Sequence, residues 1–245
     1  MGTLDELIVL LKKLRLSGVL ETLELRIAEA IDDEVAHTEF LVRLLRDEVE
    51  RRESKQMATR IHKAGFEHAK TLTDFDWAFN PTIPKTKVIE LATCGFMGRQ
   101  ENVLFLGQTG VGKSHLAQAL GYRACRAGHT VLFIAAHEMF RDLRSARADG
   151  TLTKRMQRYL NVGLLILDDL GLRALQHTDP LDLYDVIRGR YERGSLIITS
   201  NRDESELLPL FPDPLLGSAA VDRLLHHAHT MLMTGRSYRD TGRPT

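Results

Sequence analysis

A phosphate-binding loop is the clearest chemical feature of this sequence. Residues 107–114 read Gly-Gln-Thr-Gly-Val-Gly-Lys-Ser, which matches the pattern G-x-x-x-x-G-K-[ST] between an apolar run and a helical pattern. The glycines let several backbone N–H groups converge on one phosphate, and the start of the following helix adds positive potential there. We expect Lys113 to reach the β- and γ-phosphates and the hydroxyl of Ser114 to bind Mg²⁺. The candidate nucleotide-binding residues are Gly107, Gln108, Thr109, Gly110, Val111, Gly112, Lys113, Ser114 and His115.

Two carboxylates follow a short apolar run farther along the chain. Leu164–Leu167 is expected to form a buried strand, and Asp168 and Asp169 come directly after it. In an open α/β sheet, ligands collect at the carboxyl ends of the strands. We therefore expect Asp168 to hold Mg²⁺, through water, and Asp169 to orient or deprotonate the water that attacks the γ-phosphate.

Asn201 is a third polar group at the end of an apolar strand pattern, residues 196–200. If that strand lies between the strands that carry the loop and the two acids, Asn201 can hydrogen-bond the attacking water or the γ-phosphate. The alternative is that Asn201 caps a turn after the strand. The spacing of the strands favours the first interpretation.

These groups require a parallel sheet to bring them together. Short apolar runs alternate with helical patterns in the C-terminal part of the chain, which predicts an α/β fold with a parallel sheet flanked by helices. The expected strands are residues 103–106, 131–135, 164–167, 196–200 and 230–233. The expected helices are residues 113–127, 138–148, 153–160, 181–192 and 218–228.

The first 68 residues carry helical patterns and no catalytic cluster. Gly18 is expected to separate the first two helices, and Thr38 to be the N-cap of a third. The apolar face of the third helix is Phe40, Leu41, Leu44, Leu45 and Val49, and its expected i,i+4 ion pairs are Asp47 with Arg51 and Glu48 with Arg52. We interpret this region as a small all-helical domain for assembly or for binding DNA or a partner.

The composition changes near residue 70, where aromatic residues and X-Pro dipeptides favour extended or turn geometry. We therefore divide the chain into a helical domain, residues 1–70, and an ATP-binding domain, residues 71–245. The aromatic residues of the new stretch either anchor a linker to the core or form a wall for an adenine ring. They are Phe75, Trp77 and Phe79.

The composition of the chain limits the classes of protein to which it can belong. The 33 basic residues balance the 33 acidic ones, so any contact with DNA has to come from a local basic patch. Cys94 and Cys125 are too few for a disulfide scaffold and fit a reducing compartment. The N-terminus lacks the apolar stretch of a signal peptide, and no run reaches the roughly 18 apolar residues of a membrane span. We expect a soluble, cytoplasmic protein with no membrane partner.

Six segments follow one another along the chain: Phe75–Pro81 with Ile83-Pro84, Glu101–Gly107, Gly112–Ala117, Leu165–Gly171, Ile197–Asn201 and Asp222–Ala228. In this order they resemble the AAA+ ATPases of the IstB/DnaC group, and the IstB-like transposition helper proteins most of all. The helical N-terminus is also similar. The resemblance implies a P-loop domain of the AAA+ type that binds ATP with Mg²⁺.

The resemblance also implies a role for each matching position. Lys113 and Ser114 correspond to the Walker A lysine and hydroxyl, and Asp168 and Asp169 to the Walker B acids. Asn201 matches the first sensor. AAA+ proteins more often have glutamate where this chain has Asp169, and the shorter side chain implies slow hydrolysis.

Arginines outside the motifs above are candidates to contact the nucleotide. Arg223 resembles the arginine finger, which completes the ATP site of a neighbouring subunit and contributes several orders of magnitude in rate. Arg188 and Arg193 are alternative candidates. Too few residues follow the first sensor for a full helical lid, although Arg236 or Arg239 could approach the site as a second sensor.

The partners come from the resemblance alone. It implies a homo-oligomer on double-stranded DNA that directs a partner transposase, with slow, DNA-stimulated hydrolysis of ATP. A closer relationship to the DnaC-like branch of this group would instead imply that the protein loads a replicative helicase in DNA replication. A non-hydrolysing, ATP-gated adaptor is a further alternative. A small-molecule kinase would need a lid with several arginines, which this sequence lacks.

Two other clusters invite a function. His226, His227 and His229 do not predict a metal site, because on a helix only two of them share a face and no acid or cysteine joins them. Six basic residues either line a DNA-facing surface that contacts phosphates or form a solvated helix face. They are Arg141, Arg144, Arg147, Lys154, Arg155 and Arg158.

Overall fold

The computed structural model describes residues 2–68 and 70–238 and contains two compact units. The first spans residues 1–59 and the second residues 60–245, so the division falls inside a long helix, ahead of residue 70. Each unit has its own hydrophobic core. None of the helices in the described ranges is long and apolar enough to cross a membrane.

The N-terminal unit is helical, as the apolar spacing predicts: α1 (Thr3–Lys13), α2 (Ser17–Asp32) and most of α3 (His37–Ala64). Its buried apolar side chains are Leu11, Val19, Leu23 and Leu44. The apolar face expected on α3 is covered only in part, because Leu41, Leu45 and Val49 are each more than half exposed. The small core of this unit therefore leaves much of its apolar surface uncovered.

Gly18 does not separate the first two helices. It is the second residue of α2, and the chain turns before it, at Arg15, whose φ is 57°. A Cβ atom at Gly18 would lie 2.8 Å from the Cα atom of Glu48, so glycine lets α2 and α3 approach closely. Thr38 is not an N-cap either, because α3 already begins at His37.

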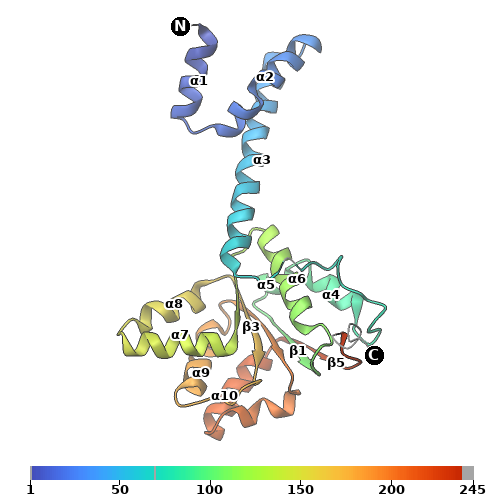
Figure 1. Ribbon diagram of the computed structural model, residues 1–245, viewed down its shortest axis with the longest axis vertical. Coiled ribbons are helices and arrows are strands. Elements are labelled where there is room, and N and C mark those ends of the chain that lie inside the picture. Colours follow the sequence, from blue (N-terminus) through green and yellow to red (C-terminus); the bar gives the residue numbers. More distant parts are fainter. Residues whose placement is uncertain (1, 69, 239–245) are drawn as a thin grey trace, which may run out of the picture. The chain divides into compact units, whose positions relative to one another are not determined.

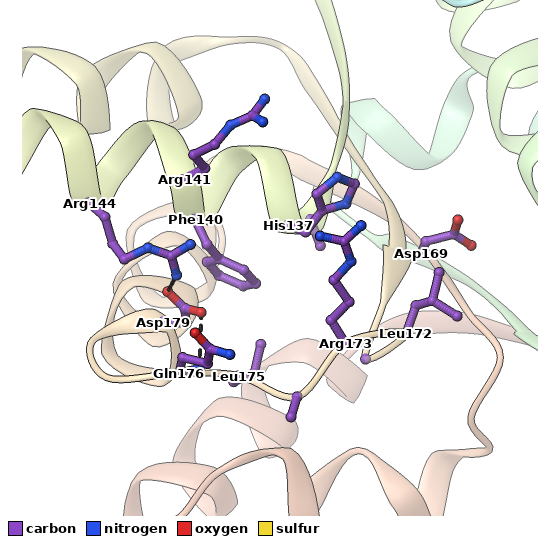
Figure 2. A pocket seen from close by; sticks show the side chains of 13 residues that line it. His137, Phe140, Arg141, Arg144, Asp169, Leu172, Arg173, Leu175, Gln176 and Asp179 are labelled. Atoms are coloured by element: carbon purple, nitrogen blue, oxygen red, sulfur yellow. Dashed lines mark hydrogen bonds and ion pairs between the residues drawn. The ribbon is translucent and has the colours of Figure 1, made fainter.

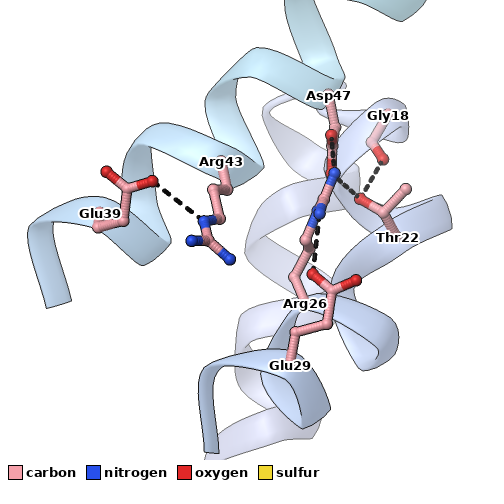
Figure 3. Close-up of polar contacts among 7 residues, drawn as sticks. All are labelled: Gly18, Thr22, Arg26, Glu29, Glu39, Arg43 and Asp47. Atoms are coloured by element: carbon pink, nitrogen blue, oxygen red, sulfur yellow. Dashed lines mark hydrogen bonds and ion pairs between the residues drawn. The ribbon is translucent and has the colours of Figure 1, made fainter. Parts of the chain in front are cut away.

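One of the two ion pairs expected on α3 forms and the other does not. The Glu48 carboxylate and Arg52 are 2.6 Å apart, as predicted. Asp47 instead pairs with Arg26 of α2, at 2.7 Å, and not with Arg51 (Figure 3). The acid therefore ties two helices together, whereas the sequence pattern places it on a solvated face.

Five strands form the sheet of the second unit: β1 (Asn102–Gly107), β2 (Val131–Ala135), β3 (Leu164–Leu170), β4 (Ser195–Ser200) and β5 (Ala228–Met233). Every neighbouring pair is parallel, and the order is β2-β3-β4-β1-β5. This confirms the predicted α/β fold and each expected strand. Strand β4 lies between β1 and β3, so the ends of the three strands that carry the candidate site are neighbours.

Helices cover both faces of this sheet (Figure 1). On one face lie α4 (Lys85–Leu91), α5 (Gly95–Gly98) and α6 (Lys113–Arg126). On the other lie α7 (Ala136–Ala148), α8 (Leu152–Asn161), α9 (Asp179–Arg190) and α10 (Pro214–Leu225), with short 3₁₀ turns at Glu204–Glu206 and Leu208–Leu210. Helix α4 was not predicted, because the X-Pro pattern favours extended chain. Pro84 stands immediately before it, where no backbone N–H is needed.

A buried arginine holds the amino ends of β3 and β4. Arg190 is 1% exposed, and its guanidinium donates five hydrogen bonds of 2.8–3.1 Å to backbone carbonyls. The acceptors are Tyr159, Leu160, Val162, Gly163 and Ser195. Arg190 therefore gathers the segments that enter both strands.

Candidate functional site

The phosphate loop runs from the end of β1 to α6 and turns at glycines. Gly107 has a φ of 125°, and a Cβ atom there would lie 2.1 Å from the carbonyl oxygen of Met233. Gly112, the N-cap of α6, has a φ of 99°, and its Cβ would lie 2.7 Å from the ring of Phe75. Any larger residue would collide at both positions, so the tight curl of the loop depends on glycine.

Lys113 lies at the centre of this loop. The residue is 6% exposed, and its Nζ atom donates to the carbonyl oxygens of Gly107 at 2.8 Å and Gln108 at 2.7 Å. Since Lys113 is also the first residue of α6, its ammonium group lies where the helix end adds positive potential. An anion at the loop is attracted by both.

Asp168 is a buried acid at the end of β3. It is 8% exposed and accepts a 2.5 Å hydrogen bond from the hydroxyl of Thr199 and another from Ser114. Burial raises the pKa of Asp168, although the two hydrogen bonds oppose this. A buried carboxylate beside a serine hydroxyl is a set of hard oxygen donors, so these residues fit the predicted Mg²⁺.

Asp169 occupies a β-bulge. Residues 167–170 of β3 face residues 198–200 of β4, so β3 has one extra residue here. Asp169 has a φ of 54° and an exposed side chain, and its N–H donates to the Thr199 hydroxyl at 2.9 Å. Thr199 thus contacts both acids. Sequence reasoning missed it, although a hydroxyl near the end of an apolar strand was a usable signal.

A cavity of about 310 Å³ lies against the loop. Residues 109–115 form one side, and Asp169 lies at its edge. Three aromatic residues also line it: Phe75, Phe79 and Tyr238. The rings of Phe79 and Tyr238 meet edge to face, with centroids 5.0 Å apart. The size of the cavity suits a small organic ligand.

Two contacts from distant parts of the chain hold the loop. The N–H of Tyr238 donates to the carbonyl oxygen of Gly110 at 2.9 Å. The Nε2 atom of His115 lies 2.9 Å from the carbonyl oxygen of Thr71. His115 was a candidate from its position after the loop, whereas nothing in the sequence indicated Tyr238.

Asn201 follows β4 and is exposed. Ser200, the residue before it, pairs with Leu106 of β1, which precedes the phosphate loop. Asn201 therefore stands beside the start of the loop, although it does not line the 310 Å³ cavity.

Arg223 lies at the opposite edge of the sheet. Its Nη1 atom donates to the carbonyl oxygen of Ala219 at 2.8 Å, and its guanidinium is 5.9 Å from the ring of Tyr184. It shares a small hollow with Asn102, the first residue of β1, whereas the phosphate loop begins at the last. Arg223 therefore does not reach the phosphate loop of its own chain.

A comparison with known protein families shows which family the chain belongs to. The model of the family described as IstB-like ATP binding protein matches residues 9–244. The chain belongs to this family. This confirms the relationship that the order of the six segments suggests.

Relatives within insertion sequences resemble nearly the whole chain. A protein named as ATP-binding in an insertion sequence of Mycobacterium tuberculosis (strain ATCC 25618 / H37Rv) is 39% identical over 237 residues, covering 96% of this chain and 94% of the relative. A protein of insertion sequence IS21 from Pseudomonas aeruginosa, also named as ATP-binding, is 36% identical over 236 residues, covering 96% and 89%.

Solved structures show the same fold at lower identity. The crystal structure of DnaI has a TM-score of 0.57 at 21% identity and covers 69% of this chain and 90% of that one. The structure of AMPPCP-bound DnaA from Aquifex aeolicus has a TM-score of 0.57 at 22% identity, covering 69% and 51%. The sheet of this IstB-like chain therefore has the same fold as that of DnaI and DnaA.

Four of the six basic residues predicted for a DNA-facing surface are in ion pairs, three of them with acids of a neighbouring helix and Arg141 with Glu138 of its own helix at 3.4 Å. The three pairs between helices are Arg144 with Asp179 (2.5 Å), Arg147 with Asp182 (2.5 Å) and Arg155 with Asp142. These arginines hold α7 to its neighbours. Arg141, Lys154 and Arg158 are exposed.

The three histidines do not share a helix, because α10 ends at Leu225 and His229 belongs to β5. The Nε2 atom of His229 lies 2.8 Å from the carboxylate of Glu101, an acid that the local sequence does not bring near. Among residues 2–68 and 70–238, no group of three His, Cys, Asp or Glu side chains could hold a metal ion. Of the two candidate second-sensor residues, Arg236 is exposed and Arg239 lies outside the described residues.

Proposed function

We propose that this protein is an AAA+ ATPase that binds ATP and Mg²⁺ in the 310 Å³ cavity. The observation that carries the proposal is the juxtaposition of the glycine-turned loop, the buried ammonium of Lys113 and the hydrogen-bonded pair of Ser114 and Asp168. These groups match the charge and the ligand preferences of a triphosphate and its metal ion. The family name and the fold support the same assignment.

Each group of the loop has a defined task in this proposal. Lys113 exchanges its two carbonyl acceptors for phosphate oxygens, and the amides of residues 110–114 bind the β-phosphate. Ser114 and Asp168 hold Mg²⁺. When bound, the ion neutralises charge on the β- and γ-phosphates.

Hydrolysis is assigned to groups at the cavity edge. Asp169 accepts a proton from a water molecule whose oxygen attacks the γ-phosphorus, while the bond from that phosphorus to the bridging oxygen breaks. ADP and inorganic phosphate are the products. Asn201 hydrogen-bonds the water or the γ-phosphate from the neighbouring strand end.

The aromatic side of the cavity is assigned to the adenine ring of ATP. Phe75 and Phe79 line the same cavity as the loop, which favours the adenine wall over a role as linker anchors alone. Phe75 also packs against the core, so it serves both purposes. Tyr238 joins them from the C-terminal segment.

Arg223 is assigned to a neighbouring subunit. Because it lies at the far edge of its own sheet, it can complete an ATP site only in another copy of the chain. Homo-oligomerisation therefore belongs to the proposal, with the helical N-terminal domain serving assembly or partner binding.

The biological role proposed is the ATP-dependent targeting of a transposase on double-stranded DNA, in slow, DNA-stimulated turnover. The relatives' place in insertion sequences supports it. The exposed cations Arg141, Lys154 and Arg158 are available to duplex phosphates. The fold likeness to a helicase loader keeps replicative helicase loading as the second candidate.

The test combines ATP binding with steady-state hydrolysis, with and without duplex DNA. Lys113→Ala is expected to weaken ATP binding roughly 10- to 100-fold, since it removes a charge-assisted contact. Arg223→Ala is expected to bind ATP normally and to hydrolyse it about 10³-fold more slowly. Arg126→Ala, an exposed arginine at the end of α6, is the control and should match the parent. ATP binding without phosphate production under any condition would instead identify an ATP-gated adaptor.

A further inference from the structure

A second cavity adjoins the candidate site. It measures about 150 Å³ and lies between α7 and the loop that follows β3 (Figure 2). Arg173 of the loop extends toward His137 of α7, whereas the side chain of Arg141, which also lines the cavity, points away from the loop. The space equals about five water molecules, which suits a small ion and is too small for a nucleotide.

The cavity carries an excess of positive charge. Arg144 is neutralised by Asp179, at 2.5 Å. Arg141 is 70% exposed and makes only a 3.4 Å contact with Glu138. Arg173 has no ion pair with any residue of the described part of the chain. Two guanidinium groups beside one small cavity are a typical binding site for an oxyanion.

Asp169 connects this cavity to the nucleotide cavity, because it lines both. Figure 2 shows it at the edge, with its carboxylate turned away from the arginines. The carboxylate that is assigned to the attacking water therefore does not neutralise Arg141 and Arg173. Because Asp169 lines both cavities, the basic cavity is the neighbour of any anion released beside this residue.

We propose that this cavity holds the inorganic phosphate released by hydrolysis, with Arg173 as its principal ligand and Arg141 and His137 around it. The proposal rests on the proposed ATPase function. Its physical basis is that phosphate leaves the loop into a positively charged space while ADP still occupies the nucleotide cavity. Phosphate held there would slow the next turnover.

The experiment measures binding of inorganic phosphate by calorimetry to protein already saturated with ADP and Mg²⁺, so that the phosphate loop is occupied. The parent is expected to bind one phosphate. Arg173→Ala should weaken that binding at least about tenfold, as expected for the loss of one charge-assisted contact. Arg173→Lys, which keeps the charge, should lie between them, and Arg126→Ala should match the parent.

Other outcomes overturn the proposal. Equal phosphate affinity of the parent and Arg173→Ala does so, as does an ADP-loaded parent that binds no phosphate. If Arg173→Ala instead weakens binding of duplex DNA and leaves phosphate binding unchanged, the cavity takes a backbone phosphate. Failure of the proposed function is separate, since it appears as a missing heat of ADP binding before phosphate is added.

Discussion

Two buried carboxylates, one in each unit of this protein, have pKa values that are shifted in opposite directions. In the N-terminal unit, Glu48 is 4% exposed and accepts hydrogen bonds from the N–H groups of Gly18, at 2.5 Å, and Val19, at 3.3 Å, and from Arg52. Burial would raise the pKa of Glu48, but these donors outweigh it and the pKa is lowered. In the second unit, the effect of burial on Asp168 is larger than that of its hydrogen bonds, and the pKa of Asp168 is raised.

The difference lies in the donors. Glu48 has a cation and two backbone amides, whereas the hydrogen bonds assigned to Asp168 come from the neutral hydroxyls of Thr199 and Ser114. A carboxylate with a full set of donors stabilises the fold, and one without a cation is ready to bind one. The first acid is therefore part of the structure, and the second is part of the candidate site.

The largest expected effect concerns Arg190, a third buried charge, whose partners are all backbone carbonyls. Burial lowers the pKa of Arg190 to about 10, so it stays charged at neutral pH. Arg190→Ala is expected to destabilise the second unit by at least about 3 kcal/mol, since each buried carbonyl left without a donor costs about 1–3 kcal/mol. Denaturant unfolding followed by circular dichroism measures this.

The control is Arg188→Ala, an exposed arginine on the same helix, which should change stability by less than about 0.5 kcal/mol. Equal effects of the two substitutions would show that the carbonyl contacts of Arg190 do not stabilise the unit.

A smaller effect is expected for Glu48→Gln. It removes the charge that Gly18, Val19 and Arg52 stabilise, which should cost about 2 kcal/mol in the N-terminal unit at neutral pH. Because the folded pKa of Glu48 is lowered, its contribution is present above the usual pKa of 4.5 and is lost as the pH falls through the folded value. Hydrogen exchange of the amides in residues 17–59 reports on this unit separately from the sheet.

The matched control is Glu39→Gln, whose acid lies on the same helix in an exposed ion pair with Arg43. It should leave exchange in the unit nearly unchanged. If Glu48→Gln behaves like this control, or if it destabilises the unit as strongly at acid pH as at neutral pH, the contrast between the two buried acids is wrong.

The sequence predicted the second unit well because its signals are local. The motif of residues 107–114 and the apolar run before Asp168 depend on neighbours along the chain, and the structure has every expected strand. Thr199 and Tyr238 were missed because their contacts join distant segments. The role of Asp47 was misjudged for the same reason, since its partner comes from another helix and not from the next turn.

The smallest expected effect tests the other half of the contrast. Asp168→Asn keeps an oxygen that can accept from Thr199 and removes the buried charge. Since the folded pKa of Asp168 is raised above 3.8, ionisation disfavours the folded state, and the stability of the parent falls as the pH rises from 3.8 through the folded pKa.

The variant without nucleotide should therefore melt about 2–4 °C higher than the parent at neutral pH, which corresponds to about 1 kcal/mol in a chain of this size. The gain should shrink as the pH falls below 3.8, the ordinary pKa, because the parent acid is then increasingly protonated in both states. Addition of ATP and Mg²⁺ should raise the melting temperature of the parent and leave that of Asp168→Asn nearly unchanged, because the variant lacks the charge that holds the ion. Scanning calorimetry at several pH values measures both effects, and a variant that is less stable than the parent without ligand would place Asp168 with the structural acids of the N-terminal unit.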